Sequence, residues 1–318
     1  SKNGSSKNNS SNGDQKLKPV NVDDFFGSST AMVKESKNKK SPIKRKSPIK
    51  STEEHDDPDF STMLVAMDNK KEEQKPRKSP NSGTAKKSSN FSRFNIISAS
   101  RQIPNIPNKF KKVKYISLDI SKKNQLKRIK EKIDIVINLG GNINHSNKKE
   151  TYESHFIGCK NLVDFFKTKN LNIFIQIGSS LEYGKISTPH KEKSKCKPNS
   201  YYGIAKLKAT NYVKKSNIPY VVLRLYQIYG PFQKKNRLIS TAIDSLIKEK
   251  IFKSSNGIQI RDFMYISDLI MLIKLILRKK KFNQGIYNVG SGKGIQVRKI
   301  LSQIKSLIQK GNLKFGYH

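Results

Sequence analysis

The sequence predicts an α/β protein with an incomplete doubly wound parallel sheet, preceded by a disordered tail. From residue 91 onward, short apolar runs alternate with segments of helical period, which is the pattern of a parallel sheet covered by helices. Residues 1–90 contain 17 hydrophobic residues, about 19%, whereas residues 91–318 contain about 40%. A segment so poor in apolar residues cannot offset the entropy of ordering. We therefore expect a basic disordered tail over 1–90 and a domain over 91–318.

The domain is expected to contain six strands. Two of them, Ile133–Leu139 and Ile173–Ile177, are apolar almost throughout, so they suit central positions buried on both faces. The other four are Phe94–Ile97, Val113–Leu118, Tyr220–Leu225 and Ile286–Val289. Helical periodicity predicts helices over residues 121–131, 151–169, 199–216, 236–250, 267–279 and 296–309.

Two apolar islands interrupt the polar tail. In the first, Val22, Phe25 and Phe26 would share one face of a single helical turn, and such a plug can enter an apolar groove on a partner. The second island spans residues 55–68 and predicts a short helix with acidic residues at its amino end. Either island could equally be a collapsed cluster in a disordered chain.

These islands resemble the amino-terminal tail of the large subunit of the replication factor C clamp loader. In that family, a double-Phe element is similar to the peptides that dock on the sliding clamp. The resemblance is confined to the tail and includes no nucleotide-binding motor. It implies a sliding clamp as the partner of Val22, Phe25 and Phe26.

The net charge of +40 comes from 64 basic and 24 acidic residues, and it is spread through the apolar part of the chain as well as the tail. Only 10 of the basic residues are Arg, and the excess Lys accompanies abundant Asn and Ile. This pattern favours a compositional origin typical of AT-rich coding sequence, because nucleic-acid sites favour Arg forks and clusters. Nonspecific nucleic-acid binding stays open.

Several classes of protein are disfavoured by what the chain contains. Two cysteines, Cys159 and Cys196, cannot build a disulfide framework, and no cluster has metal-ligand spacing. The longest apolar stretch, residues 269–277, is too short to span a membrane. We therefore expect no metal site, no membrane span and a cytoplasmic location, or a nuclear one if the tail is the functional part.

A reactive site is expected where strands end, because functional residues of doubly wound sheets gather at the carboxyl ends of the strands. Ser179 follows the strand Ile173–Ile177, and 23 residues later Tyr202 stands four residues before Lys206 at a helix start. Residues at i and i+4 share one helix face, so the ammonium can favour the ionised phenol. The Ser hydroxyl could hold the same substrate oxygen. A Tyr and a Lys at this spacing can also arise by chance on a solvated helix face.

With these residues, the segment from about 92 to 318 resembles the extended short-chain dehydrogenase/reductase family, in particular its nucleotide-sugar epimerases and dehydratases. Other stretches that agree in order and spacing are Leu118–Ile120, Leu139–Gly141, Arg224–Pro231, Arg261–Asp268 and Tyr287–Gly292. The resemblance implies a Rossmann-like sheet, an NAD or NADP cofactor and a nucleotide-sugar substrate. It also implies that Tyr202 is the general base, that Lys206 holds the nicotinamide ribose, and that Ser179 orients the reacting hydroxyl.

The same resemblance assigns ligand contacts beyond the catalytic three. The cofactor contacts are Arg101, Asp119, Ile120, Leu139, Gly140, Gly141, Lys206 and Tyr226. The substrate contacts are Ser180, Gln227, Arg237, Arg261 and Asn288. Asp119 could also be no more than a helix cap, and Arg261 could simply pair with a neighbouring Asp at the surface. The strand before Arg101 ends without an acidic residue, which slightly favours NADP over NAD.

The family's first strand and its glycine-rich turn are missing from the expected place. That turn, Gly-x-x-Gly-x-x-Gly, lets a helix amino terminus approach the cofactor's pyrophosphate. Residues 62–90 contain one glycine, Gly83, and no apolar strand after Met67, and the chain stops at His318 shortly after a predicted helix. We therefore expect an impaired enzyme, truncated at both ends and joined to an unrelated tail. The alternatives are an intact divergent enzyme and a clamp-binding tail fused to a nonfunctional enzyme fragment, and a homodimer stays open.

Overall fold

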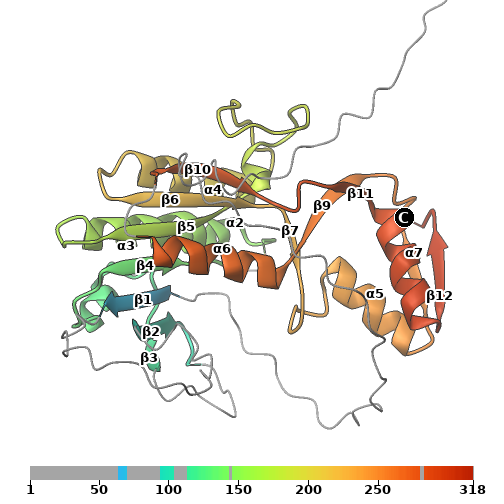
Figure 1. The fold of residues 1–318 in the computed structure, drawn as a ribbon, viewed down its shortest axis with the longest axis horizontal. Coiled ribbons are helices and arrows are strands. Elements are labelled where there is room, and N and C mark those ends of the chain that lie inside the picture. The colour runs from blue at the N-terminus through green and yellow to red at the C-terminus, as the bar shows by residue number, and fades with distance from the viewer. Residues whose placement is uncertain (1–63, 70–93, 104–112, 143–144, 280–282, 318) are drawn as a thin grey trace, which may run out of the picture.

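The computed structural model describes residues 64–69, 94–103, 113–142, 145–279 and 283–317. The predicted clamp-docking residues Val22, Phe25 and Phe26 lie outside this part of the chain. Within it, one large sheet carries helices on both faces, as predicted for a doubly wound α/β domain (Figure 1).

Seven strands form the large sheet, in the order β10-β6-β5-β4-β1-β2-β3. They are β1 (Leu64–Asn69), β2 (Phe94–Ser100), β3 (Val113–Ser117), β4 (Ile135–Asn138), β5 (Ile173–Ser179), β6 (Tyr220–Leu225) and β10 (Gly285–Val289). The neighbouring pairs that do not include β1 are all parallel. β4 and β5 are buried almost throughout, which confirms the central positions predicted from their apolar sequences.

β1 occupies the position between β2 and β4, and it runs antiparallel to both. Its first residue, Leu64, pairs with Ala99 and Asn138 near the carboxyl ends of those strands, whereas Asn69 pairs with Phe94 at the start of β2. β1 therefore occupies the sheet position between β2 and β4 that was expected to be empty, but it runs in the direction opposite to the parallel strands. It ends at the amino edge of the sheet, opposite the edge that carries the predicted site.

The prediction of a short helix in the second island is wrong over β1. In a short continuous apolar run, the spacing of apolar residues does not distinguish a helix from a strand. The open edges of β2 and β4 offer unpaired backbone groups on both sides, and pairing with them decides the conformation.

Helices cover the two faces of the sheet. α3 (Gly158–Phe166) and α4 (Tyr201–Lys214) pack on one face, and α6 (Ile266–Arg278) packs on the other (Figure 1). The predicted helix over 121–131 is instead a short 3-10 helix, η2 (Lys123–Arg128), which buries only Leu126. The predicted helix over 151–169 is divided into α2 (Lys148–Tyr152), a π-helical turn η3 (Glu153–Ile157) and α3.

A smaller part continues from the carboxyl ends of β6 and β10 (Figure 1). In it, β7 (Gln227–Tyr229), β9 (Ile260–Tyr265) and β11 (Gly294–Gln296) form one sheet, and β8 (Ile251–Ser254) pairs with β12 (Asn312–Phe315). α5 (Leu238–Ile247) and α7 (Val297–Ile308) pack there around a separate apolar cluster that includes Ala242, Phe252 and Leu301.

No helix in the described part of the chain is both long and apolar enough to cross a membrane. Within the same residues, no three His, Cys, Asp or Glu side chains are grouped as a metal site requires.

Candidate active site

Ser179 stands at the carboxyl end of β5, where the strand turns into the short 3-10 helix η4 (Ser180–Glu182). Its hydroxyl oxygen accepts the Leu181 N–H at 3.2 Å, and its own N–H donates to the Glu182 carboxylate at 2.9 Å. These bonds form a capping box, which satisfies backbone donors at the start of the turn. Ser179 is only 7% exposed and is therefore held in one position at the edge of the sheet.

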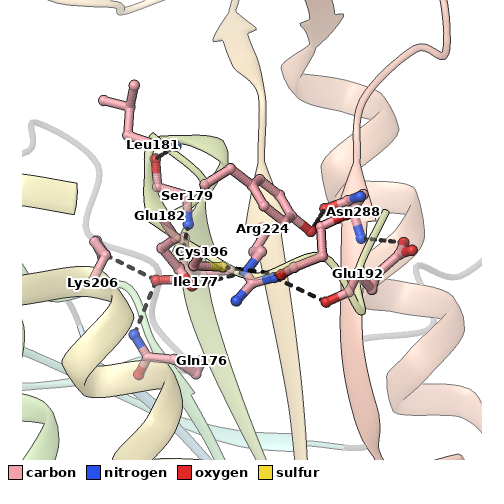
Figure 2. A network of polar contacts seen from close by, with 12 residues as sticks. Gln176, Ile177, Ser179, Leu181, Glu182, Glu192, Cys196, Lys206, Arg224 and Asn288 are labelled. Atoms are coloured by element: carbon pink, nitrogen blue, oxygen red, sulfur yellow. Dashed lines mark hydrogen bonds and ion pairs between the residues drawn. The ribbon is translucent and has the colours of Figure 1, made fainter. Parts of the chain in front are cut away.

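A buried ion pair supports this turn. Arg224 Nε donates to the Glu182 carboxylate at 2.8 Å, and both side chains are almost fully buried. The Arg224 guanidinium also lies 4.6 Å from the centre of the Tyr183 ring and donates to the Glu192 carbonyl oxygen at 3.4 Å. Figure 2 shows Ser179, Glu182 and Arg224 in one network. Because Arg224 belongs to β6, the pair ties the turn after β5 to the neighbouring strand.

α4 brings the predicted tyrosine to the same edge of the sheet. The Ser200 hydroxyl begins the helix by accepting the Gly203 N–H at 3.1 Å. Gly203 allows α4 to approach η4 closely, since a Cβ there would lie 2.5 Å from the Leu181 carbonyl oxygen. Tyr202 precedes this glycine and is therefore held beside the turn that carries Ser179.

Lys206 lies one helical turn after Tyr202 and is 4% exposed. Its ammonium donates to the Ile177 carbonyl oxygen at 2.8 Å and lies 5.7 Å from the centre of the Tyr202 ring. The structure thus brings Ser179, Tyr202 and Lys206 to the carboxyl end of β5, where the spacing in the sequence places them.

Two imidazoles pack against Tyr202. The His145 ring stacks on it with centroids 4.1 Å apart, and the His155 ring meets it edge-on at 4.8 Å. His155 belongs to η3, is 5% exposed, and bonds through Nε2 to the Asn142 carbonyl oxygen at 2.9 Å. Burial, together with the Lys206 cation, lowers the pKa of His155 to about 2, and burial also lowers the pKa of His145. Both rings are neutral at pH 7, so Nε2 of His155 is the donor to Asn142.

A small pocket of about 60 Å³ lies where β2 and β3 end. Arg101, which follows β2, lines it together with Asp119 and Ile120, which follow β3. The Asp119 carboxylate also accepts the Ser121 N–H at 2.8 Å and the Ser121 hydroxyl at 2.7 Å. Three predicted cofactor residues therefore share one pocket, and Asp119 in addition caps the turn that leads to η2.

The loop after β4 packs tightly at two glycines. A Cβ on Gly140 would lie 2.5 Å from the Ile120 side chain, and one on Gly141 would lie 1.9 Å from the His155 ring. At Gly141 a side chain would overlap the buried His155 ring, whereas at Gly140 the tip of the Ile120 side chain would have to shift, so the backbone lies directly against both side chains. Leu139, the third predicted cofactor residue of this loop, is 36% exposed.

Two predicted ligand residues join a polar cluster near the end of β10. The Asn288 side chain accepts the Tyr183 hydroxyl at 2.8 Å and donates to the His190 carbonyl oxygen at 3.0 Å. The Tyr226 hydroxyl lies 3.1 Å from His190 Nδ1. Ser180, predicted to contact substrate, is part of η4 and directly follows Ser179.

The other predicted substrate residues lie in the smaller part of the chain. Gln227 begins β7 and is exposed, and Arg237 precedes α5. Burial is the main cause of the lowered pKa of His145, and the Arg237 cation lowers it further. Arg237 therefore acts electrostatically on the ring that stacks on Tyr202. Arg261 is exposed in β9 and donates to the Ile260 carbonyl oxygen. The neighbouring Asp262 accepts backbone N–H groups of the turn after β10.

Four residues of this site were not singled out from the sequence: His145, His155, Glu182 and Arg224. Glu182 had a signal, because Ser-x-x-Glu is the pattern of a capping box. Arg224 was named only as the start of the Arg224–Pro231 stretch, and His145 and His155 had no signal, since their contacts join segments that are far apart in the chain.

The chain matches the model of the NAD dependent epimerase/dehydratase family over residues 82–290. An uncharacterized UDP-glucose epimerase of Bacillus subtilis is 28% identical over 199 residues, which are 58% of this chain and 62% of that relative. A dTDP-D-glucose 4,6-dehydratase of Dictyostelium discoideum is 29% identical over 183 residues, which are 51% of this chain and 42% of the relative. The chain thus spans less than two thirds of the length of either relative.

Solved structures show the same fold. MoeE5 in complex with UDP-glucuronic acid and NAD superposes with a TM-score of 0.61 at 19% identity, over 69% of this chain and 76% of that one. UDP-glucuronic acid 4-epimerase from Bacillus cereus, in complex with UDP-glucuronic acid and NAD, gives 0.58 at 26% identity, over 64% of this chain and 69% of that one. Because the family model covers more than half of the residues, the chain belongs to the NAD-dependent epimerase/dehydratase family.

Proposed function

We propose that this site transfers hydride between a nucleotide-activated sugar and a nicotinamide cofactor. The observation that carries the proposal is the convergence of Ser179, Tyr202 and Lys206 at the carboxyl end of β5. A fixed hydroxyl, a phenol and a buried cation are the groups needed to take a proton from a sugar hydroxyl. The substrate class is supported by the related structures, which were solved with UDP-glucuronic acid and NAD.

Each of the three residues has a distinct role in this proposal. Tyr202 takes the proton of the reacting sugar hydroxyl, and Ser179 holds the oxygen of that hydroxyl. Lys206, fixed by the Ile177 carbonyl oxygen, stabilises the ionised phenol and holds the nicotinamide ribose. The bound dinucleotide supplies the hydride acceptor. His155 stays neutral beside Tyr202, so the positive charge at the phenol comes from Lys206.

A dinucleotide has an adenosine end, a pyrophosphate and a nicotinamide end. The described residues suit its two ends, and Lys206 is the residue proposed to hold the nicotinamide ribose. The pocket of Arg101, Asp119 and Ile120 suits the adenosine end, and the close-packed backbone at Gly140 suits the loop that passes beneath the cofactor. No described residue is assigned to the pyrophosphate, since β1 ends at the opposite edge of the sheet, and the sequence of residues 70–93, outside the described part, contains a single glycine. We therefore infer weak dinucleotide binding and impaired activity for the chain as it stands.

We infer that the site has a slight preference for NADP over NAD. Arg101 follows β2 at the place where an acid would bind a free ribose diol, and its guanidinium can pair with a 2′-phosphate. The related structures contain NAD, so binding of NADH and NADPH should be compared directly.

The proposal can be tested in a grafted chain, in which a strand and glycine-rich turn from a relative replace residues 1–93. Turnover of UDP-glucose, UDP-glucuronic acid and dTDP-glucose would be followed by mass spectrometry with either dinucleotide. Tyr202→Phe should lower turnover by about 10²–10⁴-fold and leave cofactor binding nearly intact, because only the proton acceptor is lost. Lys206→Ala should damage both.

Tyr201→Phe provides the matched control, since it removes the hydroxyl of the adjacent residue, which is 50% exposed. It should keep its turnover. If the grafted Tyr202→Phe chain turned over substrate at a rate near that of Tyr201→Phe, the assignment of the general base would be wrong.

A further inference from the structure

A line of buried hydrogen bonds connects the loop after β4 with Lys206. The Gly140 N–H donates to the Asn138 side chain at 3.0 Å, and the Asn138 amide donates to the Gln176 side-chain oxygen at 2.8 Å. The Gln176 amide then donates to the Ile177 carbonyl oxygen at 3.0 Å, the same oxygen that receives Lys206 at 2.8 Å. Figure 2 shows Gln176 and Lys206 meeting at this oxygen. We call these five residues the amide relay.

Two members of the amide relay are polar side chains inside the large sheet. Asn138 and Gln176 are register partners at the end of the β4–β5 ladder and are 2% and 1% exposed. Burial of an amide is unfavourable unless its groups are bonded. Here the Gln176 oxygen accepts a second donor, Cys159 Sγ at 3.1 Å, so the side chain is bonded at both ends. A network satisfied in this way is rigid and defines one arrangement of its members.

The position of the Lys206 ammonium depends on this network. Ile177 lies one residue beyond the last β4–β5 pair, and its backbone stays paired on the other side with Leu223 of β6. Two side-chain donors converge on the Ile177 oxygen, one from Gln176 and one from Lys206. A shift of Gln176 would therefore remove the donor that shares this oxygen with the buried ammonium and helps to set the direction from which the ammonium bonds to it.

We propose that Gln176 is a positioning residue that couples the Gly140–Gly141 loop to Lys206. This inference rests on the proposed function, in which both the loop and Lys206 contact the cofactor. The relay makes the two contacts interdependent: displacing the loop displaces Asn138 and Gln176, and with them the donor that shares the Ile177 oxygen with the ammonium. Loop and lysine thus adopt their binding positions together.

Hydrogen exchange of the Gly140 N–H tests the coupling in the full 318-residue chain. Lys206→Met releases the far end of the relay, and we expect it to accelerate exchange at Gly140 at least tenfold. In a Gln176→Met background, where the relay is already broken, the same substitution should change the Gly140 rate by less than twofold. Lys208→Met is the matched control. Lys208 belongs to the same helix as Lys206 but bonds the Tyr152 hydroxyl, which is outside the relay, so its loss should leave the Gly140 rate unchanged.

Two results would overturn the proposal: a Gly140 rate that Lys206→Met leaves unchanged, or equal acceleration in both backgrounds. Gln176→Glu gives a second background in case Gln176→Met fails to fold, because a carboxylate can accept from Asn138 but cannot donate to Ile177. Exchange rates do not depend on turnover, so a chain that fails the Tyr202→Phe turnover test can still pass this one.

Discussion

The Glu182→Gln substitution should destabilise the chain far more than its small change of shape suggests. The Gln oxygen can still accept the Ser179 N–H, but its amide then presents a donor to Arg224 Nε, which is 2.8 Å from the present carboxylate. The Arg224 side chain is 3% exposed, so water cannot replace the lost partner. Breaking a buried pair in this way costs about 3–5 kcal/mol. The Tyr183 ring and the Glu192 carbonyl oxygen still face the guanidinium, so we expect about 3 kcal/mol.

Urea unfolding followed by circular dichroism measures this loss. Asp244→Asn is the control, because it breaks an exposed pair with Lys248 and should cost no more than about 0.5 kcal/mol. The double variant Glu182→Gln with Arg224→Met should recover most of the stability, since no buried charge remains and the Gln oxygen can still accept the Ser179 N–H. If Glu182→Gln cost no more than Asp244→Asn, the inference that Arg224 depends on this partner would be refuted.

Three further predictions concern the surroundings of the site. Since burial lowers the pKa of His155 to about 2, only the unfolded chain binds this proton between about pH 6.5 and 2, and stability should fall as pH falls through that window. Urea unfolding at pH 7.5 and 5.5 should show a loss about 1.3 kcal/mol greater for the wild type than for His155→Phe, and equal losses would contradict a neutral buried ring. Gly203→Ala should lower the melting temperature, because its Cβ would lie 2.5 Å from a backbone oxygen, and an unchanged value would show that α4 is not packed on η4 as described. Arg101→Ala in the grafted chain should weaken NADPH binding more than NADH binding by fluorescence titration, and equal effects would remove the argument for NADP.

The parallel strands could be predicted because their signals are local. Apolar runs such as Ile173–Ile177, bounded by polar residues and followed by helical periods, appear at the predicted places in the sheet. β1 could not be predicted, because its conformation depends on two strand edges that are distant in sequence. The π-helical turn Glu153–Ile157 was likewise missed, since it interrupts an otherwise regular helical period.

In the candidate site, too, the residues that local rules place could be predicted, and those placed by tertiary contacts could not. Tyr202 and Lys206 share a helix face at fixed spacing and Ser179 ends a strand, so local rules place all three. The partner of Glu182 is 42 residues away on β6, and only the three-dimensional pairing of β5 with β6 brings them together. The stacking of His145 on Tyr202 is a tertiary contact of the same kind.

Hydride transfer itself is measured most directly with UDP-glucose that carries deuterium at every ring carbon. The grafted chain would be mixed with this sugar nucleotide and NAD or NADP, quenched with alkali within one turnover, which preserves the reduced nicotinamide, and the dinucleotide analysed by mass spectrometry. We predict deuterium on the nicotinamide with the wild-type sequence and none with Tyr202→Phe. A grafted chain that binds both ligands but never transfers deuterium, or one that transfers it equally well without the Tyr202 hydroxyl, would contradict the proposed function.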